Sequence, residues 1–254
     1  MTDSDAVRRG EAEHLPPFEV RTDAARVARA RRWNVGLVAA AVVLLVGALV
    51  GIVAMALTGF GSWLTSGLAA VFAVLCLAVM WTARSRVRML RLLTTGDGVL
   101  RADHAGIHLP GLATIAWDDL VFVCVTNDRA RVARQSRVPV FGWAGRAAIR
   151  AGNGTVLCEL AVRDGEALRA QARDAAGASR VTLYPRWPDG HRRGVVPLLL
   201  DAVFDELDTQ AVVTMLFGVA KQRRIAHALF EELPAALRWK GPYLDDVIAG
   251  AMPH

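Results

Sequence analysis

The sequence predicts a membrane α-helical hairpin joined to a cytoplasmic α+β domain, and three observations lead to this fold class. No Asp, Glu, Lys, Arg or His occurs between Trp33 and Ala83. Short strand-like segments separated by turn residues begin near Gly98, and mixed strand and helix patterns fill the rest of the chain. A charge-free run of this length suits a hydrocarbon core, whereas a soluble core does not need it.

The charge-free run is too long for a single span, and it divides at the polar, Gly-rich turn from Thr58 to Ser62. The division leaves two predicted helices, at about 33–57 and 63–83, and each exceeds the ~20 residues that cross a bilayer core. Neither contains a charged residue, and charged residues inside a membrane usually mark ion pathways, so their absence and the presence of only two helices argue against a transporter. Residues 33–83 are therefore interpreted as a transmembrane hairpin.

Arginine placement predicts the orientation of this hairpin. The connecting turn has none, whereas both outer flanks carry a cluster: Arg26, Arg29, Arg31 and Arg32 before the run, and Arg84, Arg86, Arg88 and Arg91 after it. Because positive residues favour the cytoplasmic side, we expect a plasma (inner) membrane protein with both termini in the cytoplasm. Residues 1–32 are expected to form a basic cytoplasmic N-terminus that is disordered up to residue 23, with Ala24–Arg32 continuing the first helix.

A pair of glycines one turn apart, Gly47 and Gly51, marks a helix-packing face on the first span. Small residues at this spacing let another helix backbone approach closely. Packing against the second helix of the same chain is the favoured use, and a seam in a homo-oligomer is the alternative.

Residues 92–176 have the pattern of a small antiparallel β domain. About seven short strands separated by turn signals favour a barrel or sandwich. Asp164 is a predicted N-cap for a helix over Glu166–Ala176 that Gly177 would stop. The strands are expected at Val99–Ala102, Ile107–Leu109, Ala113–Trp117, Leu120–Thr126, Val138–Trp143, Ala147–Arg150 and Thr155–Val162.

Three stretches carry a resemblance to a known family: Asp103 with Gly106–Leu109, Ile115–Leu120, and Gly152–Leu157. Their order after a two-helix hairpin resembles bacterial, actinobacterial-type membrane proteins with a pleckstrin-homology-like (PH-like) domain. The resemblance implies a PH-like barrel with a closing helix, and it covers roughly residues 33–176. It implies little about chemistry, because a fold does not fix a function.

Residues 177–254 lie outside the resemblance and are interpreted as an α/β extension. Arg180–Tyr184 has a strand pattern, and Val212–Phe217 fits either a strand or a helix. Val195–Leu207 and Ala220–Leu233 have helical patterns, the second ending at Pro234. In that second stretch the basic residues come first and the acidic ones last, which opposes the helix dipole.

The adjacent carboxylates Asp118 and Asp119 follow Trp117 and precede an apolar run. They are interpreted as a structural corner between two strands, in which the Trp packs and the Asp pair bonds nearby backbone N–H groups. A catalytic or metal-binding pair is the alternative, and it would need partners such as His104 or His108.

The segment from Asn127 to Arg137 is rich in arginine, and no acid occurs from Arg129 to Cys158. A solvated loop is the simplest interpretation. The functional alternative is binding of anionic lipid headgroups or a partner, since arginines near an anionic bilayer each contribute about 1 kcal/mol. Nucleic acid is disfavoured as a partner because the arginines lack interleaved aromatics. The candidate binding residues are Arg129, Arg131, Arg134, Arg137, Arg146 and Arg150.

The sequence contains no recognisable catalytic motif, no metal-ligand spacing and no cofactor signature. The cysteines Cys76, Cys124 and Cys158 are interpreted as small buried residues in a reducing compartment. We therefore expect a non-catalytic membrane-anchored scaffold with a protein partner. An enzyme with its site in the C-terminal extension is the alternative, using Asp201, Asp205, His191 or His227.

Overall fold

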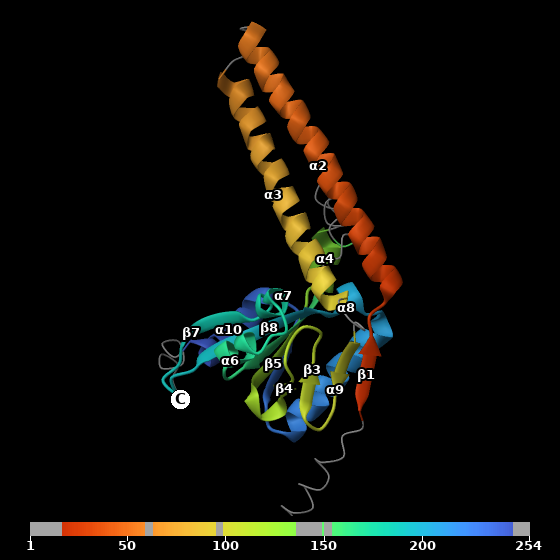
Figure 1. Cartoon of the computed structure of the whole chain (residues 1–254), viewed down its shortest axis with the longest axis vertical. Coiled ribbons are helices and arrows are strands. Elements are labelled where there is room, and N and C mark those ends of the chain that lie inside the picture. The colour runs from red at the N-terminus through yellow and green to blue at the C-terminus, as the bar shows by residue number, and fades with distance from the viewer. Residues whose placement is uncertain (1–16, 59–62, 95–98, 136–148, 150–153, 246–254) are drawn as a thin grey trace, which may run out of the picture.

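The structure is a computed structural model that describes residues 17–58, 63–94, 99–135, 149 and 154–245. A long two-helix hairpin stands on a mixed α+β domain (Figure 1). The strands expected at Val138–Trp143 and Ala147–Arg150 fall outside the described residues, apart from Ile149, which is helical.

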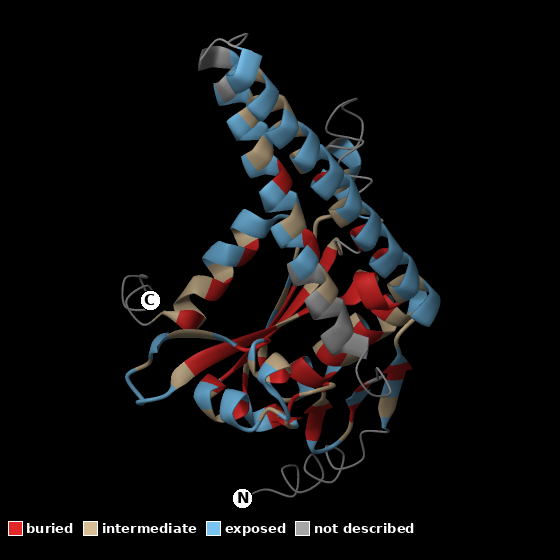
Figure 2. Ribbon diagram, turned by 45° about the horizontal axis from the view of Figure 1, so that its top comes forward, coloured by how far each residue is buried: buried red, intermediate tan, exposed pale blue. Residues whose placement is uncertain are grey.

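The apolar hairpin consists of α2 (Ala24–Thr58) and α3 (Trp63–Thr94), which pack along each other. α2 and the Gly67–Arg84 segment of α3 are each long and apolar enough to cross a membrane. Only 6% and 11% of their apolar windows are buried, whereas a core helix of a soluble protein would be mostly covered. Figure 2 shows this exposure along nearly the whole hairpin. The expected continuation of the first helix through Ala24–Arg32 is confirmed.

The expectation of disorder up to residue 23 is wrong for the residues just before the hairpin. Phe18–Arg21 forms β1, which pairs antiparallel with β2 (Val99–Ala102) just after the hairpin. Val20 is buried against the domain core. Short strands of this kind are weak sequence signals because their pairing partner lies far along the chain.

Within its described residues, the domain contains two sheets, neither of them a closed barrel. The four-stranded sheet has the order β1-β2-β3-β4, and the five-stranded sheet has the order β7-β8-β6-β5-β9. All neighbours are antiparallel except β5 and β9, which are parallel. The remaining strands are β3 (Gly106–His108), β4 (Ile115–Ala116), β5 (Leu120–Asn127), β6 (Val156–Val162), β7 (Thr182–Arg186), β8 (Arg192–Leu199) and β9 (Ala226–Phe230).

The five-stranded sheet draws strands from both sides of the expected division at residues 176 and 177. β5 and β6 come from the predicted β domain, and β7, β8 and β9 come from the predicted extension. The division therefore runs through a single sheet. The segments 92–176 and 177–254 therefore share this sheet and the core on its two faces.

Both faces of the five-stranded sheet are buried, and its side chains alternate between two clusters. Val123 and Val125 of β5 face the larger core with α9 (Glu206–Gln222), while Phe122 and Cys124 face a smaller cluster under α10 (Leu233–Leu244). Burial on both faces explains why β5 is an almost continuous apolar run. Figure 2 shows the buried residues concentrated in these central strands.

The helix expected at Val195–Leu207 is wrong. Residues up to Leu199 form β8, which pairs with β6 and β7, and α8 (Leu200–Val203) is a single short turn. The apolar spacing that resembled a helical stripe arises because β8 is buried on both faces. Leu207, which the stripe included, is exposed at the start of α9.

The helix expected at Ala220–Leu233 is also wrong. α9, which includes the ambiguous Val212–Phe217, ends at Gln222, and Arg224 has a φ of 57°, in the left-handed region that ends helices. β9 follows, and α10 then begins with Pro234 in its first turn rather than ending there. The break resolves the charge conflict, because Lys221 now lies at a helix C-terminus and Glu232 at a helix N-terminus.

The helix expected at Glu166–Ala176 is two short helices, α6 (Gly165–Ala170) and α7 (Ala175–Ala178). The N-cap prediction is confirmed, because Asp164 accepts a hydrogen bond of 2.9 Å from the backbone N–H of Ala167. Gly177 lies inside α7 rather than stopping a longer helix. The strand expected at Arg180–Tyr184 is present, shifted to β7.

Glycine is required where α6 crosses β8. A Cβ added at Gly194 would lie 2.6 Å from the Cα of Gly165, a distance that real side chains do not tolerate. We expect Gly194→Ala to lower the free energy of unfolding by about 1–3 kcal/mol, the usual cost of overpacking. The matched control is Gly218→Ala in α9, where an added Cβ meets nothing within 4 Å. That change should stabilise by about 0.5–1 kcal/mol, and thermal unfolding of the two variants in detergent tests both signs.

Candidate functional site at the base of the apolar hairpin

The apolar hairpin is fastened to the domain at both of its ends. β1 leads into α2 and β2 follows α3, and the two strands pair from Phe18↔Ala102 to Arg21↔Val99. The backbone N–H of Asp23 also donates to the carbonyl oxygen of Val203 in α8, at 2.8 Å. The chain therefore enters and leaves the hairpin through one antiparallel pair of strands, which restricts rotation of the hairpin relative to the domain.

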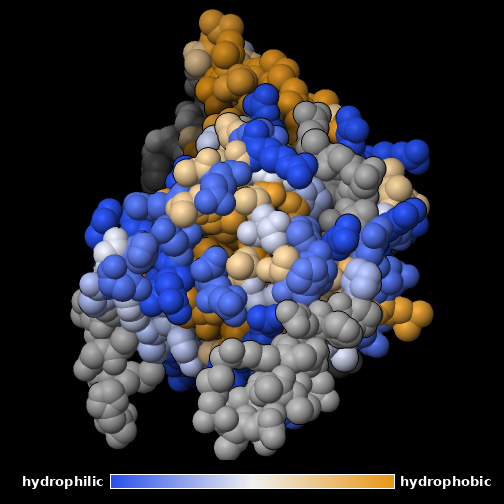
Figure 3. Space-filling view, turned by 60° about the horizontal axis from the view of Figure 1, so that its bottom comes forward, coloured by the Kyte–Doolittle hydropathy of each residue, from blue (hydrophilic) through white to orange (hydrophobic). Residues whose placement is uncertain are grey.

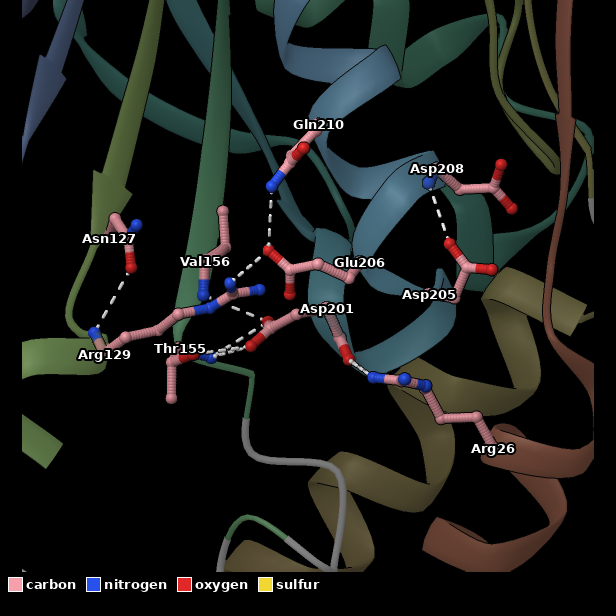
Figure 4. A network of polar contacts seen from close by, with 10 residues as sticks. All are labelled: Arg26, Asn127, Arg129, Thr155, Val156, Asp201, Asp205, Glu206, Asp208 and Gln210. Carbon is pink, nitrogen blue, oxygen red and sulfur yellow. Dashed lines mark hydrogen bonds and ion pairs between the residues drawn. The ribbon is translucent and has the colours of Figure 1, made fainter. Parts of the chain in front are cut away.

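Asp201 in α8 is the centre of a second connection (Figure 4). Its carboxylate accepts hydrogen bonds from the backbone N–H groups of Thr155 and Val156 and from the Thr155 hydroxyl, at 2.5–3.0 Å. Its main-chain oxygen accepts a 2.9 Å bond from the Arg26 guanidinium of α2. One residue thus links the base of the hairpin to the start of β6.

Gly154 accommodates this arrangement. A Cβ at this position would lie 2.6 Å from the Asp201 carboxylate and 3.2 Å from Leu199. Asp201 was a candidate for an enzyme site in the C-terminal extension. The structure instead engages its carboxylate with backbone donors, an arrangement that serves to hold β6 against the helix base.

The basic residues predicted for binding lie in two different environments. Arg129 donates a 2.5 Å hydrogen bond to Glu206 of α9, which also accepts from Gln210 (Figure 4). The hydrogen bond from Arg129 lowers the pKa of Glu206, and the same bond raises the pKa of Arg129. Both side chains are more than a third exposed, so the pair contributes about 0–1 kcal/mol. Arg129 mainly positions α4 (Arg129–Gln135) on the domain.

Arg131 and Arg134 of α4 are exposed, and neither makes an ion pair with another side chain in the part of the chain that the structure describes. They line a groove of about 420 Å³ together with Glu232 and Pro234 from the start of α10. α4 lies on the hairpin side of the domain, level with the lower part of the helices (Figure 1). The other candidate arginines, Arg137, Arg146 and Arg150, lie outside the described residues.

The glycines of the predicted packing face do not contact the second helix. A Cβ added at Gly47 or Gly51 would meet nothing within 4 Å. The favoured use of this pair, close packing against α3, therefore has no support in the geometry. The alternative of a seam with another chain stays a prediction.

Trp117, Asp118 and Asp119 form a 3₁₀ turn between β4 and β5. Trp117 is buried, and its indole N–H donates a 2.7 Å bond to the carbonyl oxygen of Asp103. Asp118 is 93% exposed and lies 3.4 Å from Arg223 rather than near a histidine. Among the described residues, no group of three His, Cys, Asp or Glu side chains is placed to hold a metal ion.

Asp103, His108 and Thr114 form a chain of contacts with the order of an acid–base relay. Asp103 lies 2.9 Å from Nε2 of His108, and Nδ1 of that ring lies 3.0 Å from the Thr114 hydroxyl. Asp103 also accepts bonds from the backbone N–H groups of Ala105 and Gly106, which close the turn into β3. Because the Asp103 carboxylate is already engaged by these backbone groups, we interpret the cluster as closing the turn between β2 and β3.

A buried ion pair under α10 is the feature that sequence reasoning missed. Lys240 Nζ lies 2.6 Å from both carboxylate oxygens of Glu159, in the middle of β6, and both side chains are less than a tenth exposed. Phe122 sits beside them, with ring centroids 5.4 Å from Trp239 and 5.7 Å from Tyr243. The available signals were a single Glu inside an apolar strand and one of only two lysines in the chain.

The cysteines beside this pair are buried thiols. Cys124 and Cys158 face opposite sides of the same sheet. Burial raises the pKa of Cys124 to about 11, with the nearby Glu159 carboxylate adding to the shift. Burial also raises the pKa of Cys158. Neither thiol is set up as a nucleophile, because the reactive species is the thiolate.

Comparisons with known proteins identify no relative of this chain. No family model, no curated protein and no solved structure matches it. The PH-like resemblance therefore remains a prediction.

We predict a large difference between single and double changes at the buried pair. Lys240→Met alone leaves the Glu159 carboxylate buried without its partner and should lower the free energy of unfolding by about 3–5 kcal/mol. The double variant Glu159→Met with Lys240→Met removes both charges and should recover most of that loss. Chemical denaturation of the full chain in detergent measures both. Equal losses in the single and double variants would contradict a desolvated, paired interaction.

We also predict an acid-dependent contribution from Asp164. The Ala167 N–H and, after it, the His191 imidazole hold the pKa of this carboxyl below its ordinary value of 3.8. Because the folded-state pKa is lowered, the stabilisation is present above pH 3.8 and is lost as the pH falls through the lower folded value. Asp164→Asn keeps the cap but removes the charge. Its stability deficit should be full near pH 6 and shrink below pH 3.8 in thermal unfolding; a deficit independent of pH would contradict the assignment.

Proposed function

We propose that this protein is a non-catalytic, membrane-anchored interaction module. In this proposal the apolar hairpin spans the plasma membrane and holds the α+β domain in a defined orientation at the cytoplasmic face. The arginine clusters flanking the hairpin support that orientation. Arg31, Arg32 and Arg84, whose side chains are exposed near the domain end of the two helices, would lie at headgroup level.

One observation carries the proposal: the hairpin is fastened to the domain at two points. The β1–β2 ladder joins both helix ends, and Arg26 joins α2 to Asp201. A flexible tether would suffice to keep an enzyme near a membrane, whereas a two-point connection fixes which face of the domain meets the bilayer. The domain would therefore keep one face toward the bilayer and expose the opposite face to the cytoplasm.

The domain surface is consistent with a soluble compartment on one side of the membrane. Figure 3, which brings the lower side forward, shows hydrophilic side chains around the domain face, apolar ones near its centre, and a hydrophobic hairpin above. Binding of a cytoplasmic protein partner to this surface is the main function that we propose. Headgroup binding by α4 is a second candidate, favoured by the exposed Arg131 and Arg134 on the hairpin side.

The orientation has a direct test. Single cysteines are introduced at Ser62, in the turn between the helices, and at the exposed Ser179 of the domain. A membrane-impermeant maleimide applied to intact cells should label Ser62→Cys and spare Ser179→Cys until the membrane is permeabilised. The unmodified chain, whose described cysteines are all buried, serves as the background control. The reverse labelling pattern would overturn the proposed topology.

Mass spectrometry then tests for the partner. The full chain is purified in mild detergent from its native membrane, and its particle mass and bound proteins are determined. A stoichiometric partner supports the interaction module. A particle that contains this chain alone, with no partner after gentle cross-linking in cells, counts against it.

A further inference from the structure

The groove between α4 and α10 lies at the hairpin end of the five-stranded sheet, and the directions of β5 and β9 determine this position. β5 and β9 are parallel, and their last paired residues are Thr126 and Phe230. Parallel strands end at the same edge of a sheet, so α4, which follows β5, and α10, which follows β9, start side by side. The same edge carries Val156, which pairs with Asn127 and bonds Asp201 next to Arg26 of the hairpin.

The charges that line this groove are of both signs and are not bonded to one another. Arg131 and Arg134 are three residues apart on α4, which places them on the same side of that helix. Glu232 faces them from the N-terminus of α10, where its side chain makes no capping bond. No ion pair joins Glu232 to either arginine in the described part of the chain. A ligand that carries both an anionic and a cationic group could bind the arginines of α4 with the first and Glu232 of α10 with the second.

Apolar surface lies beside the charged groove. Pro234 forms part of its lining, and Leu233 and Leu237 are exposed one turn apart on α10. A free, water-soluble ligand would have no use for these side chains. A lipid would, because its headgroup is followed directly by acyl chains.

We propose that this groove binds the headgroup of an amine-bearing phospholipid of the inner leaflet, of the phosphatidylethanolamine type. Arg131 and Arg134 bind the phosphate, and Glu232 binds the ammonium group. Charge-assisted hydrogen bonds of both kinds are stronger than neutral ones. The proposal rests on the orientation proposed above, since only a domain held against the bilayer brings the groove to a headgroup.

Retention of lipid by the full chain tests the site. The protein is reconstituted into nanodiscs that contain equal amounts of phosphatidylethanolamine, phosphatidylglycerol and phosphatidylcholine, and native mass spectrometry identifies the lipids that stay bound after release. We expect phosphatidylethanolamine to be enriched. Arg131→Gln with Arg134→Gln should reduce its retention roughly tenfold, and Glu232→Gln should remove the preference over phosphatidylglycerol.

The matched control is Arg169→Gln with Arg173→Gln, which removes two exposed arginines from another part of the domain and should leave retention unchanged. Enrichment of phosphatidylglycerol that is insensitive to Glu232→Gln would overturn the proposal, because it would indicate attraction by net charge alone. Equal loss in the control variant would also overturn it.

Two further readouts separate the sources of failure. Excess soluble phosphoethanolamine should not displace the lipid, because it lacks the acyl chains that contact α10; complete displacement would overturn the lipid assignment. The cysteine labelling reports orientation independently. A correct topology without selective retention refutes the groove alone, whereas inverted labelling refutes the proposed function as well.

Discussion

β9 joins the edge of the five-stranded sheet as a parallel neighbour of β5, and most of the architecture depends on this contact. A parallel connection needs a crossover, and α9 is part of the connection that carries the chain from β8 to β9 along one face of the sheet. α10 then covers the other face. The parallel pairing of β5 and β9 thus leaves α9 on one face of the sheet and α10 on the other. It also brings α4 and the start of α10 together at one edge.

Because both faces of the sheet are buried, any polar or charged side chain on them needs a bonding partner inside the protein. Glu159 sits on the face that α10 covers, and Lys240 supplies its partner from that helix. Removing two charges from water is expensive, and their attraction offsets this only when the geometry is good. The pair therefore contributes little to net stability, but it selects one placement of α10, because any other register would leave Glu159 buried and unpaired. The groove beside Glu232 depends on that placement.

How far the fold follows from the sequence depends on the range of the contacts. The apolar hairpin is evident because a charge-free run is a local property, and the Asp164 cap is evident for the same reason. β1 and β9 are not, because each is a short segment whose strand identity comes from a distant partner. At Ala220–Leu233 the order of the charges did carry a correct signal. Basic residues favour the end of a helix and acidic residues its beginning, so bases followed by acids indicate one helix ending and another starting.

In the candidate site, too, some features follow from the local sequence and others depend on distant contacts. The basic character of 129–137 is plain from the sequence, but its residues are not equivalent. Arg129 is engaged by Glu206, 77 residues along the chain, whereas Arg131 and Arg134 face a groove whose other wall lies about 100 residues away. No pattern within the basic segment distinguishes these roles, because the distinction is made by α9 and α10.

Opposite charges within one surface groove gain only about 0–1 kcal/mol by pairing, because solvent screening and the entropy of ordering two long side chains offset their attraction. The walls here belong to two separate helices: Arg129 of α4 contacts Glu206 of α9, and α10 is held by the buried Glu159–Lys240 pair. α10 cannot shift toward α4 without breaking that buried pair, and the exposed Arg129 contact contributes only about 0–1 kcal/mol. Among the described residues, Arg131 and Arg134 make no ion pair with Glu232, because closing the gap would gain little. A ligand that bridges the gap would contact both walls at once, and those contacts must exceed the cost of ordering the long side chains that line it.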